Sequence, residues 1–261
     1  MDPDNDPDTD DGADVVNISL GVSGICEEFV EPILNMVAAG VVPVVAVGNS
    51  GEGTSTSPAN IPDAIAVGAT NPYDEICYFS SGENVSWSNE YYNGDYIKPD
   101  FSGPGSGIYS VCSYGGYIAM SGTSMSSPYV AGVAALLLEK NPDFTSTQIR
   151  QILKYSSVDL GVEGKDTRFG WGRIDAFKAC ELAVSGAYES FGPYDENYGN
   201  WAYISTPQVS ESVWGNAVSI IAASSPFTRR IEFQVSADKL LWDTIDTRSH
   251  PPVSYTHLTL P

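Results

Sequence analysis

Two buried strands with a helix between them limit the folds open to this chain more than any other feature of its sequence. Residues 13–21 and 41–47 each read as strands that are apolar on both faces, and such strands must be covered on both sides of their sheet. The intervening residues 25–39 repeat apolar positions at helical spacing, and Gly40 can end that helix. A strand, a helix and a strand in this order predict a parallel α/β sheet in three layers, α/β/α.

Further helices are expected along the chain. Residues 71–121 are rich in Gly, Ser, Tyr and Asn, which is typical of loops and short strands. The helical pattern from Ser124 to Glu139 is apolar nearly all round and predicts a central helix that is buried on every side. Thr145 and Gln148 have the spacing of a capping box, which predicts one more helix after Thr145.

Past Cys180 the pattern changes to short alternating segments, such as residues 219–222 and 230–235. Alternation of apolar and polar residues predicts antiparallel strands of a sandwich-type module. This stretch stops near Pro252, before it reaches the roughly 100 residues of a complete sandwich. We therefore expect a truncated β-sandwich-like segment here.

Both ends of the chain have unusual sequences. At the start an acidic loop leads directly into a buried strand, so we expect Met1 to be an internal methionine of a longer protein. Residues 253–261 match the in-frame translation of a common sequencing adapter, and we expect them not to be native. A natural strand rich in Thr and Leu is the alternative.

The chain is strongly acidic, with 33 Asp and Glu against 12 Lys and Arg and a formal net charge of −21. A polyanion repels nucleic acid and anionic membrane surfaces, so we expect neither as a partner. No apolar run reaches the length of a membrane-spanning helix. Such acidity suits an extracellular, salt-adapted or calcium-binding protein, or reflects only a well-solvated surface.

Metal and thiol chemistry are limited by the same sequence. The four cysteines are scattered without zinc-site spacing, which leaves one or two disulfides or unpaired buried thiols. In the acidic loop, Asp4, Asp6 and Asp8 place oxygen ligands at alternating positions, which suits Ca²⁺. The loop lacks the Gly and the closing Glu of an EF-hand, and a solvated acidic loop is the alternative. We expect at most a structural Ca²⁺ and no catalytic cofactor.

The segment from Gly122 to Gly132, GTSMSSPYVAG, carries the strongest chemical signal. Ser124 lies where a loop becomes a buried helix, and the positive end of a helix favours a developing oxyanion. Gly122 removes a side chain where substrate backbone must approach, and Pro128 falls in the first turn, where its missing N–H does little harm. An ordinary helix capped by Ser or Thr is the alternative for this segment alone.

This segment resembles the nucleophile motif of the subtilisin-like serine proteases, the subtilase or peptidase S8 family. Four more segments resemble that family in its order: the substrate-lining strand, the oxyanion segment, the loop before the nucleophile and the segment that closes the domain, which are Ala13–Gly21, Val45–Gly51, Lys98–Gly105 and Phe169–Ala176. The resemblance covers about residues 12–180 and implies the C-terminal part of the catalytic domain, with a sheet that lacks its N-terminal strands.

The resemblance assigns roles to named residues. Ser124 would attack the scissile carbonyl, while its backbone N–H and the Asn49 side-chain amide would hold the oxyanion. Two segments would pair with the substrate backbone and line the pocket for the residue before the cleaved bond: Ser19, Leu20 and Gly21, and Ala46, Val47 and Gly48. Ser57–Pro58 would stand in the pocket wall, either cis, as is often found in the family, or trans, the default for an X–Pro bond.

A serine nucleophile needs a base and a carboxylate that orients it, and the family order is Asp, His, Ser. No histidine precedes Ser124, and the two in the chain, His250 and His257, lie far downstream. We therefore expect the catalytic Asp and His upstream of this sequence, and we expect this piece alone to be inactive. A catalytically inactive domain used for binding is the alternative.

The sequence therefore predicts a secreted, monomeric serine endopeptidase that acts on polypeptides. We expect four segments: an acidic loop over 1–12, the C-terminal part of the catalytic domain over 13–182, an incomplete β-sandwich over 183–252, and a non-native segment over 253–261.

Overall fold

The computed structural model describes residues 12–188 and four later segments, 219–222, 230–235, 243–249 and 256–259. The chain divides into two compact units, Met1–Gly199 and Asn200–Pro261.

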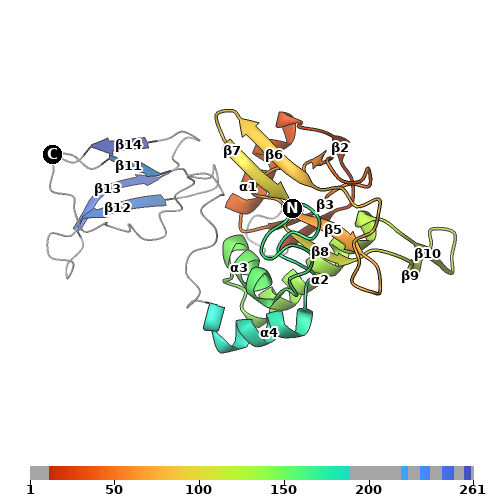
Figure 1. Cartoon of the computed structure of the whole chain (residues 1–261). Coiled ribbons are helices and arrows are strands. Elements are labelled where there is room, and N and C mark those ends of the chain that lie inside the picture. Colours follow the sequence, from red (N-terminus) through yellow and green to blue (C-terminus); the bar gives the residue numbers. More distant parts are fainter. Residues whose placement is uncertain (1–11, 189–218, 223–229, 236–242, 250–255, 260–261) are drawn as a thin grey trace. The chain divides into compact units, whose positions relative to one another are not determined.

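A four-stranded parallel sheet forms the centre of the first unit (Figure 1). Its strands, in spatial order, are β1 (Val15–Ile18), β3 (Val42–Ala46), β5 (Ile65–Thr70) and β8 (Phe101–Pro104). All residues of β3 and β5 are buried, as expected for strands that are covered on both faces. The predicted parallel α/β sheet is confirmed.

Helices pack on both faces of this sheet. Val42 and Val44 of β3 belong to the core that contains helix α2 (Thr123–Lys140), and α2 contacts all four strands. Because successive strand residues face opposite sides, Val45 faces away from that core. Helix α1 (Val30–Ala38) contacts β3 as well, and its buried residues do not belong to the α2 core. The sheet therefore has helices on its two sides, which gives the three expected layers.

Helix α1 starts later than the sequence predicts. A 3₁₀ turn (Glu27–Phe29) precedes it, and Cys26 is still extended, with φ −131° and ψ 106°. The Cys26 N–H donates to the Ser57 hydroxyl oxygen at 2.8 Å, which ties this extended residue to a distant segment.

Helix α2 follows the prediction in position but not in burial. Tyr129 and Leu136 are 45% and 54% exposed, because the described part of the chain covers only the side of α2 that faces the sheet and helix α4 (Ala176–Ser185). The expectation of burial on every side is therefore wrong for the described residues. Helix α3 (Ser146–Ser156) begins at the predicted capping box of Thr145 and Gln148, which is confirmed.

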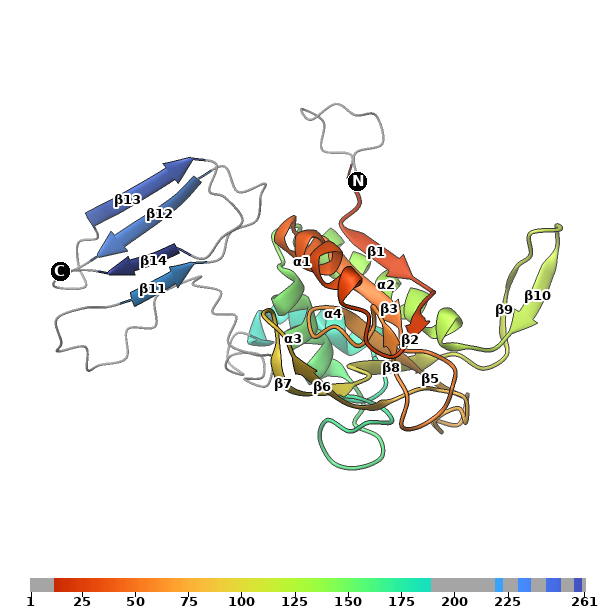
Figure 2. The same ribbon diagram turned by 90° about the horizontal axis from the view of Figure 1, so that it is seen from above.

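Residues 71–121 form hairpins as well as loops. Two antiparallel pairs, β6 with β7 and β9 with β10, span Glu83–Ser88, Asn93–Lys98, Ile108–Val111 and Tyr117–Met120. Figure 2 shows the β9–β10 hairpin extending away from the sheet.

One antiparallel pair lies earlier in the chain and joins β2 (Val22–Ser23) to β4 (Thr56–Ser57).

The second unit contains two antiparallel pairs among its described strands. β11 (Ser219–Ala222) pairs with β14 (Thr256–Thr259), and β12 (Arg230–Val235) pairs with β13 (Asp243–Ser249). Antiparallel strands were predicted at β11 and β12. The sandwich, the segment boundaries and the non-native origin of residues 253–261 stay predictions; helix α4 runs through residue 182, where the sequence places a boundary.

Candidate active site

The site lies at one edge of the parallel sheet. Parallel strands all end at the same edge, and open α/β sheets bind their ligands outside these carboxyl ends. Ser19 follows β1, the segment 47–49 follows β3, and Gly105 follows β8. The Gly122 N–H donates to the Gly105 carbonyl at 2.8 Å, which brings the start of α2 to this edge.

Ser124 occupies the first turn of α2 and is half-buried. The first four N–H groups of an α-helix have no intrahelical acceptor, and they form the positive end of the helix dipole. Gly122 is the N-cap residue and makes no side-chain cap. The backbone N–H groups around Ser124 are therefore suited to an anionic oxygen.

Ser19 connects the end of β1 to the start of α2. The Ser124 hydroxyl donates to the Ser19 carbonyl at 3.3 Å, and the Ser19 hydroxyl donates to the Ser124 carbonyl at 3.0 Å. The Ser19 hydroxyl also lies 3.2 Å from the Ser127 hydroxyl. These contacts fix the position of Ser124 relative to the first strand.

Asn49 is held against the residue before Ser124. Its Oδ1 accepts from the Thr123 N–H at 2.9 Å and from the Thr123 hydroxyl at 3.0 Å. With the oxygen engaged, the NH₂ group of the side chain is the end left to donate. A Cβ at Gly122 would lie 3.7 Å from both Oδ1 and Nδ2 of Asn49, so the amide lies beside the turn that carries Ser124.

Thr123 was not singled out by the sequence, although it lies inside the nucleophile motif. It is fully buried, and its hydroxyl also lies 3.2 Å from the Gly48 carbonyl and 3.3 Å from the Gly48 nitrogen. Gly48 has φ +118°, a region that favours glycine. Thr123 therefore joins the segment after β3 to the start of α2.

The predicted substrate-binding residues lie on two neighbouring segments. Ser19, Leu20 and Gly21 follow β1, and Leu20 is 63% exposed. On the other segment Ala46 ends β3, while Val47 and Gly48 follow it. Val47 is fully buried and donates its N–H to the Val67 carbonyl at 3.1 Å.

A network of hydrogen bonds around Ser57 lies beside these segments. The Ser57–Pro58 bond is cis, which resolves the alternatives left open by the sequence. The Ser57 hydroxyl oxygen lies 2.7 Å from Asn60 Oδ1 and 3.0 Å from the Gly24 carbonyl, and the Asn60 amide donates to the same carbonyl at 2.9 Å. Asn60 was not foreseen; its partner Gly24 is 36 residues away along the chain.

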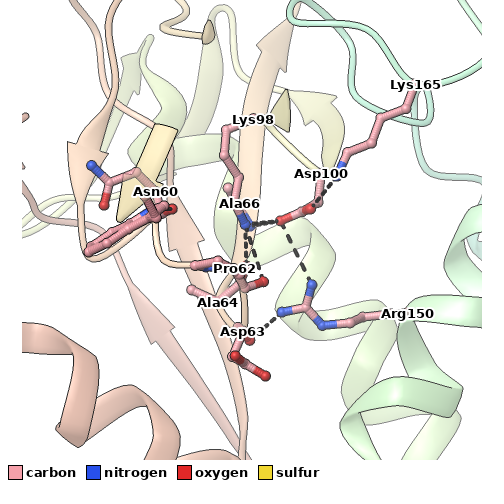
Figure 3. A network of polar contacts seen from close by, with 10 residues as sticks. Asn60, Pro62, Asp63, Ala64, Ala66, Lys98, Asp100, Arg150 and Lys165 are labelled. Carbon is pink, nitrogen blue, oxygen red and sulfur yellow. Dashed lines mark hydrogen bonds and ion pairs between the residues drawn. The ribbon is translucent and has the colours of Figure 1, made fainter. Parts of the chain in front are cut away.

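A buried charged network lies just before β8 (Figure 3). Asp100 is fully buried and accepts from Lys98 Nζ at 2.7 Å, Lys165 Nζ at 2.8 Å and the Ala66 N–H at 2.8 Å. Arg150 NH1 lies 3.9 Å away. The Asp100 carboxylate, just before β8, thus contacts β5, β7, α3 and the loop before α4.

This network shifts the pKa values of its members. Burial lowers the pKa of Lys98 to about 7, although Asp100 opposes the shift; Arg150 and Lys165 add to it. Burial alone would raise the pKa of Asp100, but the positive charges of Lys165, Lys98 and Arg150 hold it well below its usual range. We infer that Asp100 is ionised in the folded protein.

Several sequence predictions fall outside this site or outside the described residues. Asp4, Asp6 and Asp8 lie outside the described residues, and no group of three His, Cys, Asp or Glu within the described part could hold a metal ion. No histidine occurs between residues 12 and 188.

The four cysteines are unpaired, and only Cys77 is buried. No helix in the described segments has the length and apolar character needed to cross a membrane.

A parallel sheet with helices on both sides, and with Ser124 and Asn49 together at its carboxyl edge, places the chain in the class of α/β proteins. The family model for the Subtilase family matches residues 5–172. That match covers more than half of the chain, so the chain belongs to the subtilase family.

Individual relatives agree with this family. Alkaline elastase YaB of Bacillus sp. (strain YaB) is 37% identical over 166 residues, which cover 63% of this chain and 39% of the relative. The minor extracellular protease Epr of Bacillus subtilis (strain 168) is 33% identical over 193 residues, 70% of this chain and 28% of the relative. Subtilisin of Bacillus pumilus is 37% identical over 152 residues, 57% of this chain and 50% of the relative. The chain spans at most about half the length of these relatives. The roles assigned to its residues stay predictions.

Proposed function

We propose that this chain supplies the nucleophile-bearing part of a serine endopeptidase that hydrolyses peptide bonds through an acyl-enzyme on Ser124. The observation that carries the proposal is the contact of Asn49 with Thr123, which sets a side-chain amide beside the serine at the start of α2. The protease names of the relatives support it. They give no support to the binding-only alternative.

In the proposed mechanism, the Ser124 hydroxyl oxygen attacks the scissile carbonyl and gives its proton to a base. The Ser124 N–H and the Asn49 Nδ2 donate to the oxyanion that forms. Donors of this kind act without reorganisation during the reaction, and loss of the corresponding amide in subtilisin lowers kcat by about 10²–10³. Substrate backbone pairs with residues 19–21 on one side and residues 46–48 on the other.

The base and its carboxylate partner come, in this proposal, from sequence encoded upstream. An unassisted serine hydroxyl is a weak nucleophile, and both histidines of the chain follow Ser124. The limited share of each relative that the chain spans is consistent with such upstream residues. This chain by itself is therefore expected to be inactive.

The setting proposed for the enzyme is extracellular, and the name of one relative, an extracellular protease, supports this. The net charge of this chain, −21, disfavours nucleic acid and anionic membranes as its partners. We include polypeptide substrates, a monomeric state and a structural Ca²⁺ held by Asp4, Asp6 and Asp8 in the proposal.

Titration calorimetry with Ca²⁺ tests the calcium site. Unchanged Ca²⁺ affinity after these three residues are changed to Asn would rule the loop out.

The test of the activity compares the full-length gene product that contains this sequence with the present chain. Both are assayed on casein and with a serine-directed fluorophosphonate probe, and Ser124→Ala in the full-length product is the control. We expect labelling and hydrolysis by the full-length product alone, both abolished by S124A. Labelling elsewhere than Ser124, or no labelling of the full-length product, would contradict the proposal.

A further inference from the structure

The space between the two proposed substrate-binding segments contains a side chain of the protein itself. A Cβ placed on Gly21 would lie 2.6 Å from Thr56 Oγ1, and a Cβ placed on Gly48 would lie 2.8 Å from Thr56 Cγ2. Gly21 belongs to the segment after β1 and Gly48 to the segment after β3. Thr56 therefore touches both segments at once and fills the gap between them.

Thr56 is fixed in this position from several directions. Its hydroxyl donates to the Val47 carbonyl at 3.1 Å, and its backbone pairs with Ser23 in the β2–β4 ladder. The next residue, Ser57, is fully buried, and its hydroxyl contacts the Gly24 carbonyl and Asn60 Oδ1. A β-branched side chain also has few rotamers. Thr56 therefore cannot swing aside without loss of several contacts.

A carboxylate is bound to the residue before Thr56. Ser55 donates to a carboxylate oxygen of Glu83, and neighbouring strand residues point to opposite faces. Glu83 is thus attached to the face opposite Thr56. The atoms nearest to a Cβ on Gly21 or Gly48 come from Thr56, Ser57 and Ser81, and none of these side chains carries a charge. The surface that Thr56 presents there is small and uncharged.

We propose that Thr56 closes the bottom of the pocket for the residue before the scissile bond, and that the enzyme therefore prefers a small, uncharged side chain such as Ala, Ser or Gly at that position. This inference rests on the proposed function, because it takes residues 19–21 and 46–48 as the two sides of the pocket. It adds a specificity-determining residue and a substrate class to that function.

The experiment measures kcat/KM of the full-length gene product on a series of succinyl-Ala-Ala-Pro-X p-nitroanilides, with X as Ala, Val, Leu or Phe. A misfit of one methylene costs about 10–200-fold in kcat/KM, so we expect Ala to exceed Phe by at least about tenfold. Thr56→Ala removes the methyl and the hydroxyl and should shift the preference toward Leu and Phe. Thr56→Ser keeps the hydroxyl and should shift it in the same direction, but less.

Thr54→Ala is the matched control. Thr54 is another threonine of the same segment, and its hydroxyl contacts the Gly51 carbonyl at 2.6 Å and the Ser81 hydroxyl at 2.8 Å. The atoms nearest to a Cβ on Gly21 or Gly48 belong to Thr56, Ser57 and Ser81, and none of them belongs to Thr54. The Ala-to-Phe ratio of T54A should equal that of the unmodified enzyme. An equal change in T54A and T56A would overturn the role of Thr56.

The outcomes separate this inference from the proposed function. An enzyme that labels with fluorophosphonate at Ser124 but cleaves the Phe substrate at least as well as the Ala substrate overturns the inference and leaves the proposed function intact. An enzyme that neither labels at Ser124 nor cleaves any member of the series overturns both.

Discussion

Different kinds of interaction stabilise the chain at the two ends of strand β8. Just before the strand, Asp100 lies fully buried among Lys98, Lys165 and Arg150. Just after it, Gly105 accepts the Gly122 N–H and leads to a site made of neutral hydrogen bonds around a half-buried serine. Before β8, buried ion pairs hold the chain. After β8, neutral hydrogen bonds surround Ser124, and in the proposed reaction a negative charge forms there only in the transition state.

The largest effect should come from the charged end. Asp100→Asn leaves Lys98, Lys165 and Arg150 without their shared carboxylate, and breaking a buried ion pair in this way costs about 3–5 kcal/mol. Urea denaturation of the full-length gene product should show this loss in the free energy of unfolding. Asp74→Asn is the control: it removes the ion pair with Arg173, which is partly exposed and should contribute only about 0–1 kcal/mol. Equal losses in the two variants would contradict the comparison.

The neutral end should affect activity rather than stability. Asn49→Ala removes the side-chain amide, and kcat should fall by about 10²–10³ with little change in KM. The free energy of unfolding should change by less than in D100N, because Asn49 is exposed. Steady-state kinetics of the full-length product measure the first effect, and denaturation of the same variant measures the second. A rise in KM with unchanged kcat would place Asn49 in ground-state binding instead.

A pH dependence should distinguish the two ends further. The pKa of Lys98 is about 7 in the folded protein against an ordinary 10.5, so between these values the unfolded chain binds the additional proton. Stability from this group therefore increases as pH rises from about 7 toward 10. Lys98→Met should remove that contribution. Denaturation of the unmodified protein and K98M at both pH values tests this, and parallel pH profiles would show that Lys98 does not titrate in this window.

The smallest effect should come from a cap far from both ends of β8. Thr145→Ala removes the hydroxyl that accepts the Gln148 N–H at 3.2 Å, and loss of an N-cap costs about 0.5–2 kcal/mol. The free energy of unfolding should fall by this amount, while kcat stays unchanged. Loss of activity in T145A would mean that helix α3 supports the site more directly than the structure indicates.

The sequence predicted those elements whose causes are local. The parallel sheet followed from apolar runs such as residues 41–47, and helix α3 followed from the capping box at Thr145, because these patterns involve neighbours along the chain. Ser124 and Asn49 were singled out from motif order, and the structure brings them to the same edge of the sheet. The start of α1 was misplaced, because Cys26 is extended and contacts Ser57, 31 residues away, and no neighbour along the chain indicates this.

The features that escaped the sequence depend on contacts between distant residues. Thr56 looks like any strand threonine until the fold brings it against Gly21 and Gly48. Asp100 and Lys165 lie 65 residues apart, and a lysine and an aspartate in a sequence usually indicate a solvated surface. The exposure of Leu136 also could not be foreseen, because its apolar neighbours suggest burial equally well on either face.

Three backbone carbonyls accept hydrogen bonds from the turn that carries Ser124. The Ser124 hydroxyl donates to the Ser19 carbonyl, the Gly122 N–H donates to the Gly105 carbonyl, and the Met125 N–H donates to the Gly122 carbonyl. Peptide groups are the same whatever the side chain, but Gly105, which supplies one of these carbonyls, has no room for one, because a Cβ there would lie 2.3 Å from Ser126 Oγ and 2.6 Å from the Ala69 Cβ. The position of the serine therefore depends on the absence of a side chain at Gly105, whereas Leu20, which is 63% exposed, has space around its own.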